Sequence, residues 1–220
     1  GAASIIVGQA SGTGGDGIRV TNGVRANAMG EYMVPATKGG TDLIITATGT
    51  VTGSVSGIDA HNNGMGFTNI TATDVTGTTG DGVAAYNGAM TTDLTITASG
   101  AVSGDDDGID AVNNGTGLTT IDVAAATGTN SEGLSVINNG TATGIAITAS
   151  GDIAGGFIGL RSHNYANGAN TISVGNVTGT NGDGLFAYSG ANASDMSVTA
   201  TGNVSGGNFG IRAGNLGAGA

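Results

Sequence analysis

The sequence has 220 residues, with 45 glycines, four phenylalanines and four tyrosines, and it has neither tryptophan nor cysteine. So few large side chains exclude a thick globular core, and the lack of cysteine excludes disulfide bonds and cysteine-based metal sites. The net charge of −11 argues against binding to nucleic acid or to an anionic membrane, because both need a basic surface. No apolar run has the length of a membrane-spanning helix, so we do not expect a membrane-spanning protein.

The chain begins with one irregular unit. A glycine followed by isoleucine stands at Gly17 and again at Gly57, an interval of 40 residues, whereas later intervals are about 15 residues shorter. The excess falls in residues 23–40, which contain Pro35, the only proline. We interpret 23–40 as a loop insertion in the first coil of a repeat structure.

From Gly57 onward the repeat is regular. A glycine followed by Ile, Val or Leu recurs at alternating intervals of 25 and 26 residues, which gives a higher-order unit of 51 residues. Such fixed spacing is the signature of a stacked repeat fold. The recurring glycines are Gly82, Gly108, Gly133, Gly159, Gly184 and Gly210.

Each unit contains two clear strands and one short strand. In residues 94–98 apolar side chains alternate with threonine, Val102 supplies one inward position of the short strand, and 109–113 alternate again before an Asn-Gly turn. The pattern predicts an all-β, right-handed parallel β-helix (β-solenoid) of about eight coils, a single domain over 1–220 and a rod roughly 38 Å long.

Asparagine recurs at the end of the second clear strand with inward parity. Stacked side-chain amides can donate and accept hydrogen bonds along the rod, so we expect a structural ladder rather than a ligand site. Its members are Asn22, Asn62, Asn87, Asn113, Asn138, Asn164 and Asn215, interrupted by Ser189.

The outward positions of the first clear strand are rich in hydroxyl groups, as in Thr95, Thr97 and Ser99. Regular Thr-x-Thr arrays on solenoids resemble ice-binding surfaces, whereas solvated β-branched residues on an outer strand are the ordinary explanation. The array is interrupted by Ile44, Asp122, Ala124, Ala146 and Gly175.

Acidic residues gather beside the recurring glycine. Asp81, Asp107 and Glu132 occupy equivalent positions of three consecutive coils, and Asp105 and Asp106 lie next to the middle one. Oxygen-rich turns of this kind suit Ca²⁺, and solvated turn carboxylates are the alternative.

One outward position of the second clear strand carries a stripe of large side chains. An exposed stripe of this kind marks a contact surface for a partner, a glycan or a second copy, with cover by a neighbouring loop as the alternative. The stripe consists of His61, Tyr86, Val112, Ile137, His163 and Tyr188.

The pattern predicts no catalytic residue and no cofactor. Asp152 and Arg161 do not form a recognisable acid–base pair, and His61 and His163 lie four coils apart, too far to share one metal ion. We therefore expect a protein that is not an enzyme.

Three recurring segments resemble the passenger regions of bacterial autotransporters and related adhesins. They are Ile-Thr-Ala-Ser-Gly (96–100), Val-Ser-Gly (102–104) and Gly-Ile-Asp-Ala-Val-Asn-Asn-Gly (108–115), and their equivalents cover most of 41–216. The resemblance implies a right-handed β-helix displayed outside a Gram-negative cell, with a C-terminal translocator barrel. No barrel is present in these residues, so we expect a fragment of a longer repeat protein.

We therefore expect an adhesin or structural stalk at the outer-membrane surface or in the extracellular space. Its partner would be a host or neighbouring cell surface, a glycan, or a second copy joined end to end or laterally. A self-assembling extracellular filament or matrix protein is the alternative, and an ice-binding solenoid is a third class.

Overall fold

The computed structural model describes residues 1–23 and 40–217, and across these residues the chain forms strands and turns but no helix. The predicted loop insertion at 23–40 lies outside the described residues except for Gly23 and Gly40.

One sheet of the described chain has eight parallel strands, and each coil contributes one strand to it. Neighbouring strands pair residue by residue over their full five-residue length, without a register shift. The strands are β3 (Ile18–Asn22), β6 (Ile58–Asn62), β9 (Val83–Asn87), β11 (Ile109–Asn113), β13 (Leu134–Asn138), β16 (Leu160–Asn164), β19 (Leu185–Ser189) and β22 (Ile211–Asn215).

The other sheet of the described chain has 14 strands, all paired in parallel, and the coil bends partway along it. Its main path is β1 (Ala3–Val7), β4 (Leu43–Ala47), β7 (Thr68–Ala72), β10 (Leu94–Gly104), β12 (Leu118–Gly128), β14 (Gly144–Ala149), β17 (Gly168–Val174) and β20 (Ala193–Ala200). The short strands after the bend are β2 (Ala10–Gly12), β5 (Val51–Gly53), β8 (Val75–Gly77), β15 (Ile153–Gly155), β18 (Val177–Gly179) and β21 (Val204–Gly206), and β10 and β12 run through the bend unbroken.

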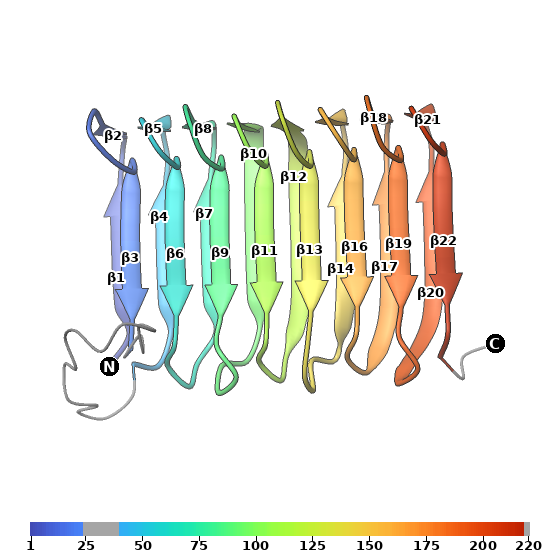
Figure 1. The fold of residues 1–220 in the computed structure, drawn as a ribbon. Helices are drawn as coiled ribbons and strands as arrows, with labels where there is room; N and C mark the ends of the chain where they lie inside the picture. The colour runs from blue at the N-terminus through green and yellow to red at the C-terminus, as the bar shows by residue number, and fades with distance from the viewer. Residues whose placement is uncertain (24–39, 218–220) are drawn as a thin grey trace, which may run out of the picture.

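The handedness of the stack can be followed in Figure 1. Strands of the eight-stranded sheet run downward in front, strands of the other sheet run upward behind, and the chain advances from left to right. This is a right-handed coil, so the predicted all-β, right-handed parallel β-helix is confirmed.

The core is a narrow space between the two sheets, filled by columns of one residue per coil. Ile70, Ile96, Ile121 and Ile147 are paired in register and are at most 1% exposed. Complete burial of such a side chain stabilises the fold by about 1.5–3 kcal/mol. Alanine and valine fill a second column, which lets the two sheets approach closely.

A glycine ends each short strand because the chain turns there against its own backbone. A Cβ atom on Gly104 would lie 1.9 Å from the carbonyl oxygen of Asp107, and one on Gly128 would lie 2.0 Å from that of Glu132. Only glycine allows this close approach, which sets the corner of every coil.

Candidate functional site

The outward side chains of the eight-stranded sheet form two columns, which together are called the outer face below. The second position of each strand gives the first column: Arg19, Asp59, Ala84, Asp110, Ser135, Arg161, Phe186 and Arg212. The fourth position gives the second column: Thr21, His61, Tyr86, Val112, Ile137, His163, Tyr188 and Gly214.

The outer face holds an unusual share of the large and charged side chains. Within residues 1–23 and 40–217, every lysine or arginine lies in its first column and both histidines lie in its second. The six residues of the predicted stripe are consecutive members of the second column, on one side of the rod. They point outward but are half-buried, because neighbouring large side chains shield one another.

The C-terminal half of the outer face carries an aromatic cluster around His163. The ring of His163 lies 4.7 Å from Phe186, 5.9 Å from Tyr188 and 5.6 Å from Tyr165, measured between ring centroids. The guanidinium carbon of Arg212 sits 3.7 Å from the centre of the Phe186 ring, a cation–π contact. Packing of this kind holds the rings in fixed positions relative to one another.

Burial governs the charge of His163. Burial, together with the charges of the nearby Arg161 and Arg212, lowers the pKa of the imidazole to about 4. The Tyr165 hydroxyl and His163 Nδ1 lie 3.1 Å apart. His163 is therefore a neutral ring at physiological pH, and it behaves as an aromatic side chain rather than as a cation.

The N-terminal half of the outer face carries a smaller cluster built on ion pairs. Arg19 Nε lies 2.6 Å from Asp16 and 3.0 Å from Asp59, and His61 Nε2 lies 2.9 Å from Asp59. The hydrogen bond from His61 and the charge of Arg19 hold the pKa of Asp59 below its usual value. The rings of His61 and Tyr86 lie 5.7 Å apart, so a His–Tyr pair occurs in both halves of the face.

Between the two halves, Asp110 and Arg161 flank Ser135. Arg161 donates from Nη2 to Ser135 Oγ at 2.9 Å and pairs through Nη1 with Glu132 at 3.3 Å. Asp110 forms no ion pair with any residue of 1–23 or 40–217, and burial raises the pKa of its carboxyl. The charge of Arg161 and a hydrogen bond with Ser135 oppose this rise in the Asp110 pKa, so the centre of the face holds a carboxyl that shares no direct ion pair.

The asparagine ladder occupies the last position of the same strands, on the side that faces the core. Residue pairing places its members in one continuous column with Ser189 in the seventh coil, and Asn62, Asn87, Asn113, Asn138 and Asn164 are fully buried. A structural role fits this position because each amide lies at a turn of the buried backbone.

The hydrogen bonds of the ladder differ from the predicted amide-to-amide stack. Among the described residues only Asn22 donates directly to the next amide, to Asn62 Oδ1 at 3.2 Å. Asn113 instead accepts from the backbone N–H of Gly115 at 2.9 Å and donates to Thr119 Oγ1 at 3.1 Å. The amides therefore stabilise the turns that follow their own strands. The alternation along the strand predicts that these side chains face inward, but it does not predict their hydrogen-bond partners.

Buried hydroxyl groups connect neighbouring amides of the ladder. Thr119 donates to Asn138 Oδ1 at 2.5 Å, so it links Asn138 to the preceding coil. In the unit 51 residues later the two residue types are exchanged, with Asn170 and Ser189 at these positions, both fully buried. The link is not repeated there: Asn170 Oδ1 accepts from Ser162 Oγ at 2.8 Å, and Ser189 Oγ has no hydrogen-bond partner among the described residues.

The acidic turn residues do not gather into a metal site. Asp107 accepts the backbone N–H of Glu132 through Oδ1 at 2.7 Å, and Asp81 accepts that of Asp107 at 3.0 Å. In the described part of the chain, no three His, Cys, Asp or Glu side chains lie close enough together to hold a metal ion. The residues considered for Ca²⁺, which are Asp81, Asp105, Asp106, Asp107 and Glu132, therefore do not form such a group.

The carboxylates of Asp81 and Asp107, which accept these backbone hydrogen bonds, make the stability of the fold depend on pH. Burial raises the pKa of Asp107 to about 7 and that of Asp81 to about 6, both from 3.8. The folded state therefore binds these protons more tightly than the unfolded state, and the stability they contribute is full below pH 3.8 and lost as the pH rises through 6 to 7.

We expect Asp107→Asn to have a higher Tm than the wild type at pH 8, by about 3 °C for each kcal/mol of relief. The difference should shrink as the pH falls to 5, because the wild-type carboxyl is then protonated. Thermal unfolding of both proteins between pH 5 and 8 measures this, and the paired comparison cancels the opposite contribution of His163. A constant difference across this range would contradict the assignment.

The hydroxyl-rich surface lies on the other sheet. One column there contains Thr46, Thr71, Thr97, Thr148, Ser173 and Thr199 and is interrupted by Asp122. The short strands carry a second hydroxyl column that sequence parity did not reveal, because each short strand has only one outward residue: Ser11, Thr52, Thr76, Ser103, Thr127, Thr178 and Ser205, interrupted by Ala154.

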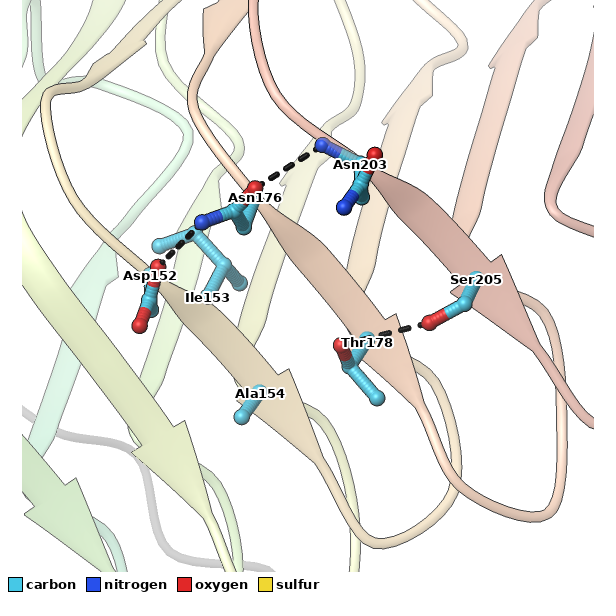
Figure 2. A pocket seen from close by; sticks show the side chains of 7 residues that line it. All are labelled: Asp152, Ile153, Ala154, Asn176, Thr178, Asn203 and Ser205. Atoms are coloured by element: carbon cyan, nitrogen blue, oxygen red, sulfur yellow. Dashed lines mark hydrogen bonds between the residues drawn. The ribbon is translucent and has the colours of Figure 1, made fainter.

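Figure 2 shows an open polar groove on this surface, over β15, β18 and β21. Asn176 donates to Asp152 at 2.9 Å and accepts from the backbone N–H of Asn203 at 2.8 Å, while Ser205 donates to Thr178 at 3.3 Å. Hydrogen bonds therefore join Asp152, Asn176 and the Asn203 backbone, and Thr178 and Ser205, from coil to coil along the groove.

In the described ranges no apolar helix is long enough to cross a membrane. Comparison with protein-family models, with curated proteins and with solved structures gave no match for this chain.

Proposed function

We propose that the chain is a non-enzymatic β-helix module of an extracellular or outer-membrane protein, acting as an adhesin or structural stalk that makes contact through its outer face. The resemblance of its repeats to autotransporter passengers supports this location. The stacked coils provide a stiff support, because each coil is hydrogen-bonded to both neighbours along the stack.

The observation that carries the proposal is the uneven distribution of side chains between the two sheets. The outer face gathers the described arginines and histidines with Tyr86, Phe186 and Tyr188, whereas the opposite surface carries short hydroxyl side chains. Tyrosine, histidine and arginine are the residue types that anchor protein contacts, because they give large contact areas with polar tips.

The test is a double substitution at the two tyrosines of the second column. We expect Tyr86→Ser with Tyr188→Ser to weaken adhesion of protein-coated beads to epithelial cells or immobilised glycans at least tenfold, since aromatic anchors carry about 2 kcal/mol or more of binding energy. Each tyrosine also loses ring contacts worth about 0.5–1.5 kcal/mol, so Tm is measured in parallel.

A matched pair on the opposite surface serves as the control. Thr97→Ala with Ser173→Ala changes two outward side chains of the other sheet and should leave adhesion unchanged. If the threonine and serine pair abolished adhesion while the tyrosine pair did not, the contact surface would lie on the hydroxyl-rich side and the proposal would be wrong.

A further inference from the structure

Resting on the proposed function of the outer face, we propose that its partner is a second copy of the same chain. The two copies pack face to face and antiparallel, about a two-fold axis that runs along β13.

The symmetry follows from the shape of the face. Its strands stand side by side in a straight row, as Figure 1 shows. A two-fold axis along a strand reverses the order of the coils and keeps the strand direction, so the first column of one copy lies against the first column of the other. With the axis on β13, β11 faces β16, β9 faces β19, and β6 faces β22.

The charges of the first column match in this register. Asp110 faces Arg161 of the second copy, and Asp59 faces Arg212, each twice by symmetry. Asp110 forms no ion pair within the described residues, and the Arg161 side chain stays 30% exposed beside its partner Glu132, so both side chains can be reached from the outer face.

Other registers of the same symmetry are unfavourable. An axis on β11 would place Asp110 against Asp110 of the second copy. An axis between β11 and β13 would place Arg19 against Arg212 of the second copy. An axis between β13 and β16 would place the Asp110 carboxylate against the Phe186 ring. Like charges or an unpaired carboxylate across a contact cost free energy, which selects β13.

Side-chain sizes match in the same register. In the first column the smallest residue, Ala84, faces the largest apolar one, Phe186, of the second copy. In the second column Tyr86 faces Tyr188, and Ile137 faces itself on the axis. The contact thus combines charge pairs beside the axis with apolar and aromatic pairs on both sides, and aromatic residues and arginine are enriched in protein interfaces.

The overall charge disfavours contact between most surfaces of two copies, because each chain carries −11. From β6 to β22 the two columns hold two aspartates and two arginines, so their net charge is zero when histidine is neutral. Seven coils of five-residue strands cover about 34 Å by about 17 Å, or about 600 Å² of each copy. That area lies at the low end for specific interfaces, so the dimer is weak and reversible.

The decisive experiment mixes two charge variants. Asp110→Arg alone places arginine against arginine, and Arg161→Asp alone places aspartate against aspartate, so each variant should dimerise at least tenfold more weakly than the wild type in sedimentation velocity. When the two variants are mixed, every arginine faces an aspartate, and the heterodimer should form with near wild-type affinity. A contact within one chain cannot be restored by mixing.

Circular dichroism and thermal unfolding verify that each variant is folded, and a cysteine substitution gives an independent measurement. The chain has no cysteine, so Ile137→Cys places one thiol of each copy on the axis. A short bifunctional thiol reagent should crosslink Ile137→Cys to a dimer, whereas Thr97→Cys on the opposite sheet should remain a monomer.

A wild-type protein that stays monomeric throughout the concentration series, with uncrosslinked Ile137→Cys, would overturn the self-association. In that case a continued loss of adhesion in the tyrosine double variant would leave the proposed contact function in place. Crosslinking of Ile137→Cys without rescue by mixing would overturn the register, because the copies would then meet in another arrangement.

Discussion

Gly128→Ala is expected to lower the free energy of unfolding by more than about 4 kcal/mol or to prevent folding altogether. The added Cβ would lie 2.0 Å from the Glu132 carbonyl oxygen and 2.6 Å from that of Asp106. Both atoms belong to the backbone, and the Glu132 carbonyl accepts the N–H of Gly108 in the neighbouring coil, so no side-chain rotation relieves the clash. Chemical denaturation followed by circular dichroism measures the loss.

Gly88→Ala is the matched control, because Gly88 is also buried and lies at a turn of the coil. The nearest atoms to its added Cβ lie at 3.4 Å, an ordinary contact distance. It should change stability by less than about 1 kcal/mol. Equal effects of the two substitutions would show that the corner is not set by close backbone approach.

Asn113→Asp is expected to lower the free energy of unfolding by about 3 kcal/mol at pH 7, although it changes only one atom of the side chain. The amide of Asn113 donates to Thr119 Oγ1 and to the Gly117 carbonyl, and a carboxylate cannot donate to either. The substitution also places a charge at a fully buried position. Thermal and denaturant unfolding at pH 7 measure the change.

The sign of the pH dependence separates the lost donors from a general packing defect. Burial raises the pKa of the new carboxyl in the folded state, so the destabilisation is present above that pKa and decreases as the pH falls through it. We therefore expect the Tm difference between Asn113→Asp and the wild type to narrow toward pH 4. Asn113→Ala, which does not titrate, should show a constant loss.

The repeat period made most of the fold predictable. The spacing between Ile96 and Gly108, repeated in coil after coil, fixed both the number of coils and the residues that stack on one another. Alternation within 109–113 gave the inward and outward sides, because a strand has only two faces. The stripe from His61 to Tyr188 and the asparagine column followed from the same parity, and their members lie in register.

The contacts between side chains were not predictable in the same way. Parity places Asn113 inside the coil but does not say that Thr119, rather than the next asparagine, accepts its hydrogen. The first column of the outer face was overlooked because its members mix basic, acidic, small and aromatic residues, although those from Asp59 to Phe186 each stand two positions before a stripe residue. Tyr165 follows the strand instead of belonging to it, so only the structure brings its ring to Tyr188, 5.6 Å away.

The parallel pairing of every strand has a mechanical consequence. The backbone hydrogen bonds between coils point along the rod. Tension applied along its length therefore acts first on the bonds of an end coil and breaks them one after another. Each freed coil of about 25 residues releases roughly 85 Å of extended chain in place of a rise of about 5 Å. Such a rod yields stepwise when it is pulled, and it lengthens many-fold before the last coil is lost.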